Sequence, residues 1–283
     1  MTRLAVIGYP IKHSISPAMH QAALDALGVD ARYERVEVVQ GDLPAFVAEL
    51  RSGEWGGVNV TVPHKEAVLP LLDEVTPEAA AIGAVNTIVL SEDRLIGHNT
   101  DAAGFLRALR DDGGFDPAGR VVALLGAGGA ARAVLWSLVQ SRTSVVRLFN
   151  RSPERAHRLA KAARDWGEWT EVAVETWGQD TADWQDLLSD CDLVVNATSV
   201  GLLPKESPLP AEAIPADALV ADLIYNPRPT RLLRDAVGRD LRTLDGLPML
   251  VYQGAAAFEL WTELKAPIAV MLRAAESALN LRS

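Results

Sequence analysis

The sequence predicts an α/β protein that is built from two domains. Short runs of β-branched residues alternate along the chain with longer amphipathic stretches, a pattern typical of strands joined by helices. Aliphatic residues dominate and only 6% of the residues are aromatic, a composition typical of buried parallel strands. With 283 residues, the chain is long enough to form two hydrophobic cores.

The first third of the chain contains three predicted strands and two predicted helices. We expect the strands at 4–7, 33–39 and 58–62, and the helices at 17–27 and 43–51. In the third of these strands, Asn59 and Thr61 alternate with valines and therefore point to one face, and Pro63 ends the strand.

A second series of strands and helices begins near Val121. We expect strands at 121–125, 145–149, 193–195 and 219–224, and helices at 130–140 and 153–164. A helix at 101–109 joins the two series, and from Leu247 onward the pattern is purely helical, with Pro267 between two helices. We expect the last helices to pack back on the first domain or across the junction between the two domains.

Composition restricts the partners and the compartment. The formal net charge of −10 is spread along the chain and disfavours nucleic acid and anionic membranes, which require a basic surface. Cys191 is the only cysteine, so no intrachain disulfide can form, and we expect it to be a packing residue. The apolar run at the N-terminus is too short for a signal peptide, and no stretch approaches the roughly 18 apolar residues of a membrane span. We expect a soluble cytoplasmic protein; its oligomeric state, a homodimer included, stays open.

The segment 126–131 has the strongest local motif. It matches G-x-G-x-x-A directly after an apolar strand and before a helix. Glycines at these positions permit a tight turn and a close approach to a pyrophosphate, which the helix N-terminus then binds. We predict a dinucleotide site that includes Gly126, Ala127, Gly128, Gly129 and Ala130. The alternative is a flexible strand–helix connection without a ligand.

The end of the next predicted strand indicates which dinucleotide binds. An enzyme that uses NAD normally has Asp or Glu there, to accept hydrogen bonds from the ribose 2′-hydroxyl. This chain has Asn150, Arg151 and Ser152, with Arg155 close behind. Two guanidinium groups and a hydroxyl suit a 2′-phosphate, and a cation near a helix N-terminus opposes the dipole unless an anion is present. We therefore predict NADP rather than NAD.

Two later strands also end in polar segments, at 195–199 and 222–227. Ligands of open parallel sheets lie beyond the carboxyl ends of the strands, so these segments are placed to meet the ribose and the nicotinamide. Asn and Ser are also ordinary turn residues, and both interpretations stay open at this point.

The first domain carries polar residues in otherwise apolar settings. They are Ser14, Ser16, Asn59, Thr61, Lys65, Asn86, Thr87, Asn99, Thr100 and Asp101. Hydroxyls and amides at several strand ends are suited to holding a polyhydroxylated ring. Lys65 and Asp101 are the only charged members, and oxidation of a secondary alcohol needs a group that takes the hydroxyl proton. A lysine can do so where burial lowers its pKa from about 10.4 towards neutrality. The competing interpretation makes Lys65 a solvated cation at a helix start and Asp101 the N-cap of the linking helix.

Together these motifs resemble the shikimate dehydrogenase family. The resemblance runs in order from Leu4 to about Trp261, and the motifs are short but jointly specific. The matching segments are 8–10 (GYP), 14–17 (SISP), 59–65 (NVTVPHK), 83–87 (GAVNT), 99–101 (NTD), 126–132 (GAGGAAR), 150–152 (NRS), 196–198 (NAT), 245–250 (DGLPML) and 252–255 (YQGA).

The resemblance implies an N-terminal α/β substrate domain completed by C-terminal helices, which we assign to 1–101 plus 247–283, and a Rossmann-type NADP-binding domain, which we assign to 102–246. It implies that Lys65 is the acid and base for the proton and that Asp101 is its partner, which also holds a ring hydroxyl. Ser14 and Ser16 would hold the substrate carboxylate with Tyr225, whereas Thr61, Asn86 and Gln253 would hold ring hydroxyls, and Asn59 would support that cluster. The implied cofactor residues are Gly126 to Ala130, Asn150, Arg151, Ser152, Arg155, Thr198, Leu223 and Gly246; no metal is implied.

Departures from the family pattern are small. Ser152 stands where threonine is common, which preserves the hydroxyl, and no role is assigned to Pro77, whose position is often polar in relatives. The implied reaction is the NADP-dependent reduction of 3-dehydroshikimate to shikimate, in the biosynthesis of chorismate and aromatic amino acids. A dual-specificity quinate/shikimate dehydrogenase and a non-catalytic NADP-binding regulatory protein are the alternatives, and a folate-type dehydrogenase is a weaker one. The Ser14 and Ser16 pair favours shikimate over quinate, whose extra hydroxyl needs room beside the carboxylate.

Overall fold

The computed structural model describes residues 2–175, 177 and 181–281. Contacts between Cα atoms divide the chain into two compact units. The terminal unit consists of Met1–Gly104 and Val251–Ser283, and the central unit of Phe105–Leu250. The chain passes between the units within helices α4 (Asp101–Asp111) and α9 (Gly246–Thr262). Across the described ranges, none of the helices is both long and apolar enough to cross a membrane.

The terminal unit contains a mixed six-stranded sheet in the order β2-β1-β3-β5-β6-β4. Its strands are β1 (Thr2–Gly8), β2 (Ala31–Glu37), β3 (Trp55–Val60), β4 (Glu74–Val75), β5 (Thr87–Ser91) and β6 (Arg94–His98). Strands β2, β1 and β3 run parallel, and β5 is antiparallel to both β3 and β6. The reversal at β5 places the start of that strand beside the end of β3.

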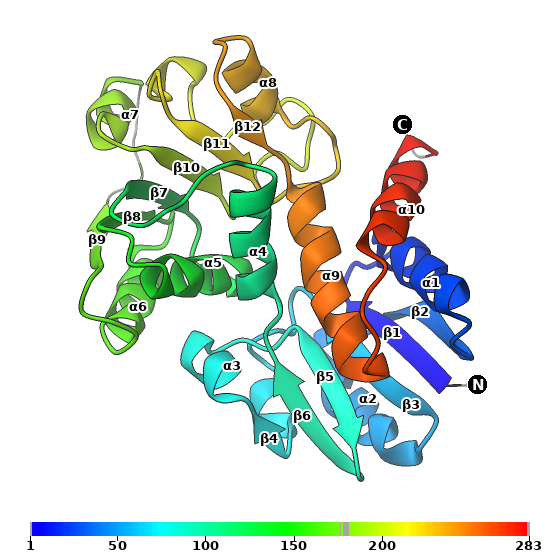
Figure 1. Cartoon of the computed structure of the whole chain (residues 1–283). Coiled ribbons are helices and arrows are strands. Elements are labelled where there is room, and N and C mark those ends of the chain that lie inside the picture. Colours follow the sequence, from blue (N-terminus) through cyan, green and yellow to red (C-terminus); the bar gives the residue numbers. More distant parts are fainter. Residues whose placement is uncertain (1, 176, 178–180, 282–283) are drawn as a thin grey trace. The chain divides into compact units, whose positions relative to one another are not determined.

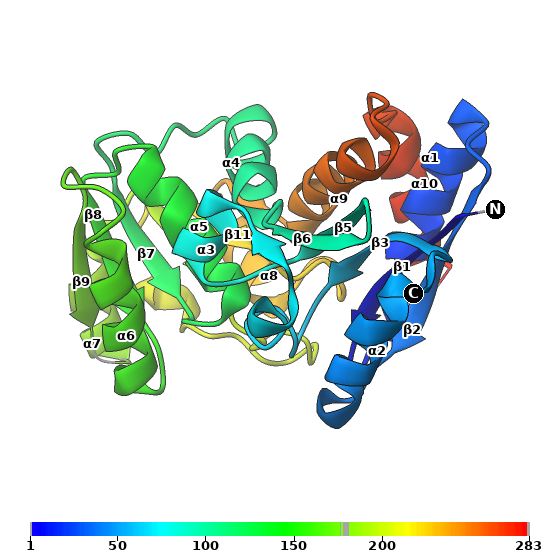
Figure 2. The same cartoon turned by 90° about the horizontal axis from the view of Figure 1, so that it is seen from below.

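Helices cover both faces of the parallel part of this sheet. Helix α2 (Leu43–Glu49) lies on one face, where Phe46 and Val47 share a core with Ala5 and Ile7 of β1. Helices α1 (Ser16–Leu27) and α10 (Ile268–Asn280) pack on each other on the opposite face (Figure 2). Because side chains alternate in direction along β1, this strand can pack against helices on both faces of the sheet. The short helix α3 (Pro77–Ile82) precedes β5.

The central unit is a doubly wound sheet of the Rossmann type (Figure 1). Its strands are β7 (Val121–Leu125), β8 (Val145–Phe149), β9 (Glu171–Glu175), β10 (Leu193–Asn196), β11 (Leu219–Asp222) and β12 (Thr243–Leu244), in the order β12-β11-β10-β7-β8-β9. All the pairings are parallel. The strand order reverses between β7 and β10, the position at which open α/β sheets bind ligands.

Four helices flank the central sheet. Helices α5 (Gly129–Gln140) and α6 (Pro153–Ala163) contact each other (Figure 1). Helices α7 (Thr181–Leu188) and α8 (Arg231–Val237) share a core with alternate residues of β7, Ala123 and Leu125. Cys191 is buried in this core, and its burial raises the pKa of the thiol to about 12. Short 3₁₀ helices occur at Gln40–Asp42, Leu50–Ser52, Leu69–Leu71 and Ala211–Ala213.

The strands predicted at 121–125 and 145–149 are confirmed at both ends, and Pro267 separates α9 from α10 as expected. The prediction at 58–62 is wrong at both ends, because β3 begins at Trp55 and ends at Val60. Gly56 and Gly57 resemble chain breakers in the sequence. In the structure, the indole of Trp261 occupies the place of a side chain at Gly57, and an added Cβ would also lie 2.6 Å from the Ile88 carbonyl oxygen. Thr61 therefore lies just after the strand.

The buried imidazole of His20 gives a prediction about stability and pH. His20 lies in α1 and is 0% exposed, and neither ring nitrogen has a hydrogen-bond partner among the described residues. Burial lowers the pKa of His20 to about 3. In the unfolded chain a histidine titrates near 6.5, so below that pH the unfolded state binds a proton that the folded state does not. As the pH falls from about 6 to about 4, we expect His20 to lower the free energy of unfolding by about 1.4 kcal/mol for each pH unit.

The measurement compares wild type with His20→Gln by urea denaturation from pH 4 to pH 8. Asp222 titrates in the same window with the opposite sign, because its burial raises the pKa of the carboxyl group to about 6. Asp222 is present in both proteins, so the difference between them isolates His20. A difference in unfolding free energy that does not change with pH would contradict the prediction.

Candidate active site and cofactor site

The topology of the terminal unit gathers its polar residues at one edge of the sheet. The carboxyl ends of β1 and β3 lie at this edge, and β5 begins there, since Asn59 pairs with Thr87. Strand β6 ends there as well, because Thr87 also pairs with His98. Asn86 and Asp101, which are distant from β3 in the sequence, are thus placed next to it.

Lys65 and Asp101 form an ion pair at this edge. Lys65 Nζ donates to Asp101 Oδ2 at 2.6 Å, and the two side chains are only 14% and 5% exposed. Lys65 lies in a turn after β3, where its carbonyl oxygen accepts from the Val85 amide at 2.8 Å. The interpretation of Lys65 as a solvated cation at a helix start is therefore wrong.

Asp101 is the first residue of α4, and Asn99 supplies the cap. Asn99 Oδ1 accepts from the amides of Asp101 at 3.1 Å and Ala102 at 3.3 Å. The interpretation of Asp101 as the N-cap is wrong, since its carboxylate oxygens accept from Lys65 and from Asn86 Nδ2, the latter at 2.9 Å. The local cap leaves the carboxylate of Asp101 for the site.

Asn86 is the centre of the polar cluster and is 2% exposed. Its Nδ2 atom also donates to Thr100 Oγ1 at 2.8 Å and to Gln253 Oε1 at 3.2 Å, so α9 contributes to the cluster. Its Oδ1 atom accepts from the Thr100 amide at 2.7 Å and from Thr87 Oγ1 at 3.2 Å, and these contacts together orient the side-chain amide. The structure thus brings together Lys65, Asn86, Asp101 and Gln253.

Ser14, Ser16 and Thr61 lie at the same edge of the terminal unit. Ser14 and Ser16 belong to the segment between β1 and the first turn of α1, and the Ser16 amide donates to Ser14 Oγ at 3.2 Å. Thr61 follows β3, and its amide donates to the Ile7 carbonyl oxygen of β1 at 2.9 Å. A Cβ added at Gly8 would lie 2.6 Å from Thr61 Cγ2, so the glycine permits this approach.

Tyr33, which is absent from the predicted site, joins the cluster together with the hydroxyls of Thr87 and Thr100. Tyr33 Oη donates to Asn59 Oδ1 at 2.7 Å, and Asn59 Nδ2 donates to Thr87 Oγ1 at 3.1 Å. Thr87 and Thr100 belong to polar motifs that the sequence shows. Tyr33 has no such signal, because it alternates as an ordinary strand residue and its partner is 26 residues away.

In the central unit, the glycine motif lies between β7 and α5. Gly126 has a φ of 115°, and an added Cβ would lie 2.9 Å from the Ala197 carbonyl oxygen, so only glycine suits this position. Gly128 occupies the N-cap of α5, and in the described part of the chain no side chain caps this helix. Its first amides are therefore placed to bind an anion.

The residues predicted to hold a 2′-phosphate lie between β8 and α6. Asn150 Nδ2 donates to the Ser152 carbonyl oxygen at 2.9 Å, which shapes the turn, and Arg151 and Arg155 are exposed. The Ser152 hydroxyl donates to Glu154 Oε2 at 2.9 Å. The backbone amide of Glu154 and this hydroxyl lower the pKa of the Glu154 carboxyl group.

The other predicted cofactor residues lie at the carboxyl ends of β10 and β11. Asn196 Oδ1 accepts from Thr198 Oγ1 at 2.7 Å, and Asn196 Nδ2 donates to the buried Asp222 at 3.0 Å. A side chain at Gly246 would meet the Leu223 carbonyl group, so the backbones of these two predicted residues are in contact. Tyr225 follows β11 in the same unit.

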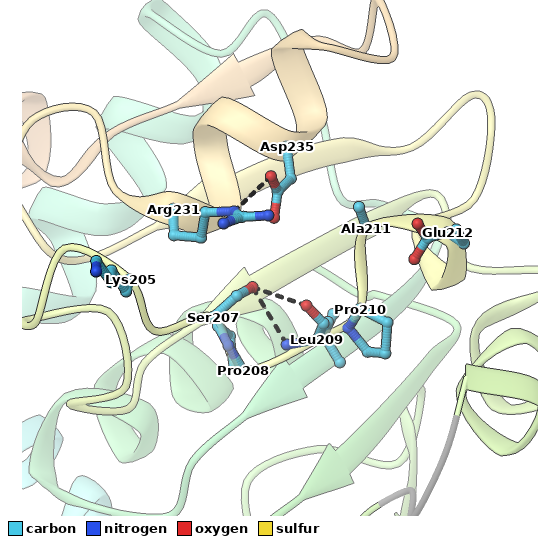
Figure 3. Close-up of a pocket in the computed structure, with 9 residues that line it drawn as sticks. All are labelled: Lys205, Ser207, Pro208, Leu209, Pro210, Ala211, Glu212, Arg231 and Asp235. Carbon is cyan, nitrogen blue, oxygen red and sulfur yellow. Dashed lines mark hydrogen bonds and ion pairs between the residues drawn. The ribbon is translucent and has the colours of Figure 1, made fainter.

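A separate cavity of about 470 Å³ lies elsewhere in the central unit, near the start of α8 (Figure 3). Its charged lining residues include Lys205, Glu212, Arg231 and Asp235. Arg231 Nε donates to both carboxylate oxygens of Asp235, at 2.7 and 2.8 Å (Figure 3). No residue of the predicted sites lines this cavity, and its charged groups include both signs.

The two units define a class of protein. A Rossmann sheet with an uncapped glycine turn is a dinucleotide-binding domain, and a lysine–carboxylate pair among hydroxyls and amides is suited to an alcohol. The protein is therefore a nicotinamide-dependent oxidoreductase with a separate α/β substrate unit.

Comparisons with known proteins identify the family. Residues 6–88 match the shikimate dehydrogenase substrate binding domain, and residues 246–276 match the shikimate 5′-dehydrogenase C-terminal domain. The chain is 46% identical over 282 residues to the shikimate dehydrogenase (NADP(+)) of Moorella thermoacetica. The aligned region covers 99% of this chain and 94% of that protein. The chain belongs to the shikimate dehydrogenase family.

Solved structures agree with this assignment. The shikimate 5-dehydrogenase of Thermus thermophilus, in complex with NADP(H) and shikimate, matches with a TM-score of 0.87 and 44% identity, over 99% of this chain and 100% of that one. The quinate dehydrogenase of Corynebacterium glutamicum, in complex with NAD, matches with a TM-score of 0.87 but 31% identity, over 98% of this chain and 99% of that one.

Proposed function

We propose that this protein is an NADP-dependent shikimate dehydrogenase, which reversibly reduces 3-dehydroshikimate to shikimate in the biosynthesis of chorismate and aromatic amino acids. The observation that carries the proposal is the Lys65–Asp101 pair, with a distance of 2.6 Å between Nζ and Oδ2, inside a cluster of hydroxyls and amides. A protein that only bound NADP would need neither residue.

Lys65 handles the proton in this proposal. When the alcohol is oxidised, Lys65 in its neutral amine form takes the hydroxyl proton at Nζ as the hydride leaves. In the reverse reaction its ammonium form gives this proton to the ketone oxygen as the hydride arrives. Asp101 Oδ2 holds the ammonium group in place, and Asp101 Oδ1 is itself held by Asn86. This arrangement supports a pair that acts as one unit rather than an isolated lysine.

The rim of the cluster would bind the rest of the substrate. Ser14 and Ser16 would bind the carboxylate with Tyr225, and Thr61, Asn86 and Gln253 would bind ring hydroxyls. Asn59 supports them from β3, where its Nδ2 atom donates to the Asn86 carbonyl oxygen at 3.3 Å. The side chains of Ser14, Ser16, Asn59, Asn86 and Gln253 are less than 10% exposed, which limits the positions that these groups can adopt.

NADP supplies the hydride acceptor, and in reduced form the hydride donor, when it is bound. The residues of the central unit suit it, because Gly126 leaves room where a side chain would collide with Ala197, and the amides at the start of α5 suit the pyrophosphate. Arg151 and Arg155 would bind the 2′-phosphate, with Asn150 shaping the turn and Ser152 offering a hydroxyl. Thr198, Leu223 and Gly246 would lie along the ribose and the nicotinamide.

A dual-specificity quinate/shikimate dehydrogenase is the second candidate. The similarity to a quinate dehydrogenase over 98% of the chain favours it. Quinate carries a further hydroxyl on the carbon that bears its carboxylate, and the Ser14 and Ser16 side chains are already buried there. We therefore expect kcat/KM to be higher for shikimate than for quinate.

The test follows absorbance at 340 nm with purified protein, shikimate or quinate, and NADP⁺ or NAD⁺, in all four combinations. Fast turnover with shikimate and NADP⁺ alone would support the proposal. Comparable kcat/KM values with quinate or with NAD⁺ would favour the dual-specificity candidate. No turnover in any combination would favour the regulatory protein.

The homodimer and the cytoplasmic location stay predictions. Sedimentation velocity of the purified protein at several concentrations tests the first. Fractionation of the source cells, with detection of the chain by an antibody, tests the second.

A further inference from the structure

A chain of buried hydrogen bonds leads from Tyr33 in β2 to the Lys65–Asp101 pair. Tyr33 Oη donates to Asn59 Oδ1 at 2.7 Å, and Asn59 Nδ2 donates to Thr87 Oγ1 at 3.1 Å. Thr87 Oγ1 lies 3.2 Å from Asn86 Oδ1, and Asn86 Nδ2 donates to Asp101 Oδ1 at 2.9 Å. The five residues are at most 6% exposed, so water does not substitute for these bonds.

The chemistry of each group gives this chain one direction. Burial raises the pKa of Tyr33 well above its ordinary value, so the phenol keeps its single proton and donates it to Asn59. That contact defines Asn59 Oδ1 as the acceptor and turns Nδ2 towards Thr87. Because Thr87 Oγ1 accepts there, its own proton goes to Asn86 Oδ1 at 3.2 Å or to Thr100 Oγ1 at 3.3 Å, and the latter atom itself accepts from Asn86 Nδ2. Asn86 then presents its NH₂ group to Asp101, the acceptor at the end of the chain.

Tyr33 itself is held by two aromatic neighbours. The His20 ring stacks on the Tyr33 ring with centroids 4.2 Å apart and planes within 2°, and Trp261 of α9 is tilted against both. Trp261 Nε1 is anchored by the Ile88 carbonyl oxygen at 3.0 Å. Gly254 leaves the space beside His20, because an added Cβ would lie 3.1 Å from Nε2. The phenol ring therefore has little freedom to move away from Asn59.

We propose that Tyr33 is a positioning residue for the reaction, which acts through Asn59, Thr87 and Asn86 to orient the Asp101 carboxylate towards Lys65. This inference rests on the proposed function. Loss of the Tyr33 hydroxyl would leave Asn59 Oδ1 without its donor in a buried setting, and the side chain would have to turn or shift to find another. The change would pass to Asn86 and Asp101, and so to the group that holds the proton-transfer lysine.

The test is Tyr33→Phe, which removes one oxygen and keeps the ring that stacks on His20 and contacts Trp261. We expect kcat for shikimate oxidation to fall about 10-fold, with the KM for NADP⁺ unchanged, because that site lies in the central unit. The same substitution is then made in a Lys65→Ala background. Since Tyr33 acts through the lysine's partner, we expect it to change the residual kcat of that variant by less than about 2-fold.

Thr143→Val is the matched control. It also removes a buried hydroxyl, one without a partner among the described residues, from the central unit, and it should keep the wild-type kcat. Tyr33→Phe with wild-type kcat would overturn the inference. An equal fold loss with and without Lys65 would also overturn it, since a general loosening of the fold acts in both backgrounds. Wild-type protein inactive on shikimate would instead show that the proposed function itself has failed.

Discussion

Replacement of Lys65 by alanine is expected to lower kcat for shikimate oxidation by about 10²–10⁴-fold, the range of general acid–base catalysis, with a modest change in KM. The physical reason is that Lys65 Nζ is the charged donor on Asp101 Oδ2, and the pair is largely withdrawn from solvent. A water molecule can replace the lysine as a proton carrier. However, it is not fixed at the position of Lys65 Nζ, and its pKa is not matched to the proton transfer. Steady-state kinetics at 340 nm with shikimate and NADP⁺ provide the measurement.

Two further variants sharpen this experiment. Lys205→Ala removes an exposed lysine that lines the separate cavity and belongs to neither predicted site, so it should keep the wild-type rate. Asp101→Asn keeps the shape of the side chain but removes its charge. If the two residues act as a unit, the Lys65→Ala/Asp101→Asn double variant should be no slower than Lys65→Ala alone. A Lys65→Ala protein with near-wild-type kcat would remove Lys65 from the chemistry.

The sequence predicts strands β7 and β8 of the central unit better than the strands of the terminal unit, for a physical reason. Strands such as β7 and β8 are buried on both faces, so they appear as continuous aliphatic runs bounded by turn residues. In the terminal unit, β5 and β6 form an antiparallel pair whose burial depends on partners far along the chain, and the sequence pattern gives no expectation for them. The start of β3 is not evident from the sequence, because Gly56 and Gly57 look like chain breakers and Trp261, which packs against Gly57, lies about two hundred residues later in the chain.

In the candidate site too, the sequence indicates residues that stand in short motifs but not the contacts between segments that are distant in the chain. Lys65, Asn86 and Asp101 stand in short polar motifs, so the sequence alone indicates them. What the sequence could not predict is how they are held. The cap of α4 comes from Asn99 and not from Asp101, and the orientation of Asn59 depends on Tyr33 in another strand. Both depend on the direction of side chains, which the spacing of residues does not determine.

Replacement of both Arg151 and Arg155 by alanine is expected to raise the KM for NADP⁺ by about 10²-fold or more, and to leave the KM for NAD⁺ nearly unchanged. Each hydrogen bond to a charged group contributes about 1.5–3 kcal/mol, and NAD⁺ lacks the phosphate that both guanidinium groups would bind. The kcat at saturating NADP⁺ should stay near the wild-type value, because neither arginine touches the reacting atoms. Initial rates over a range of each cofactor, at saturating shikimate, provide the measurement.

The position of these arginines makes the result informative. Helix α6 begins at Pro153 with Ser152 as its N-cap, so both cations lie beside the positive end of the helix dipole. A bound phosphate would be stabilised there by the dipole and by both guanidinium groups. Arg158→Ala is the control, because Arg158 is exposed on the same helix but lies beyond its first turn. An unchanged preference for NADP⁺ in the double variant would mean that other groups bind the 2′-phosphate.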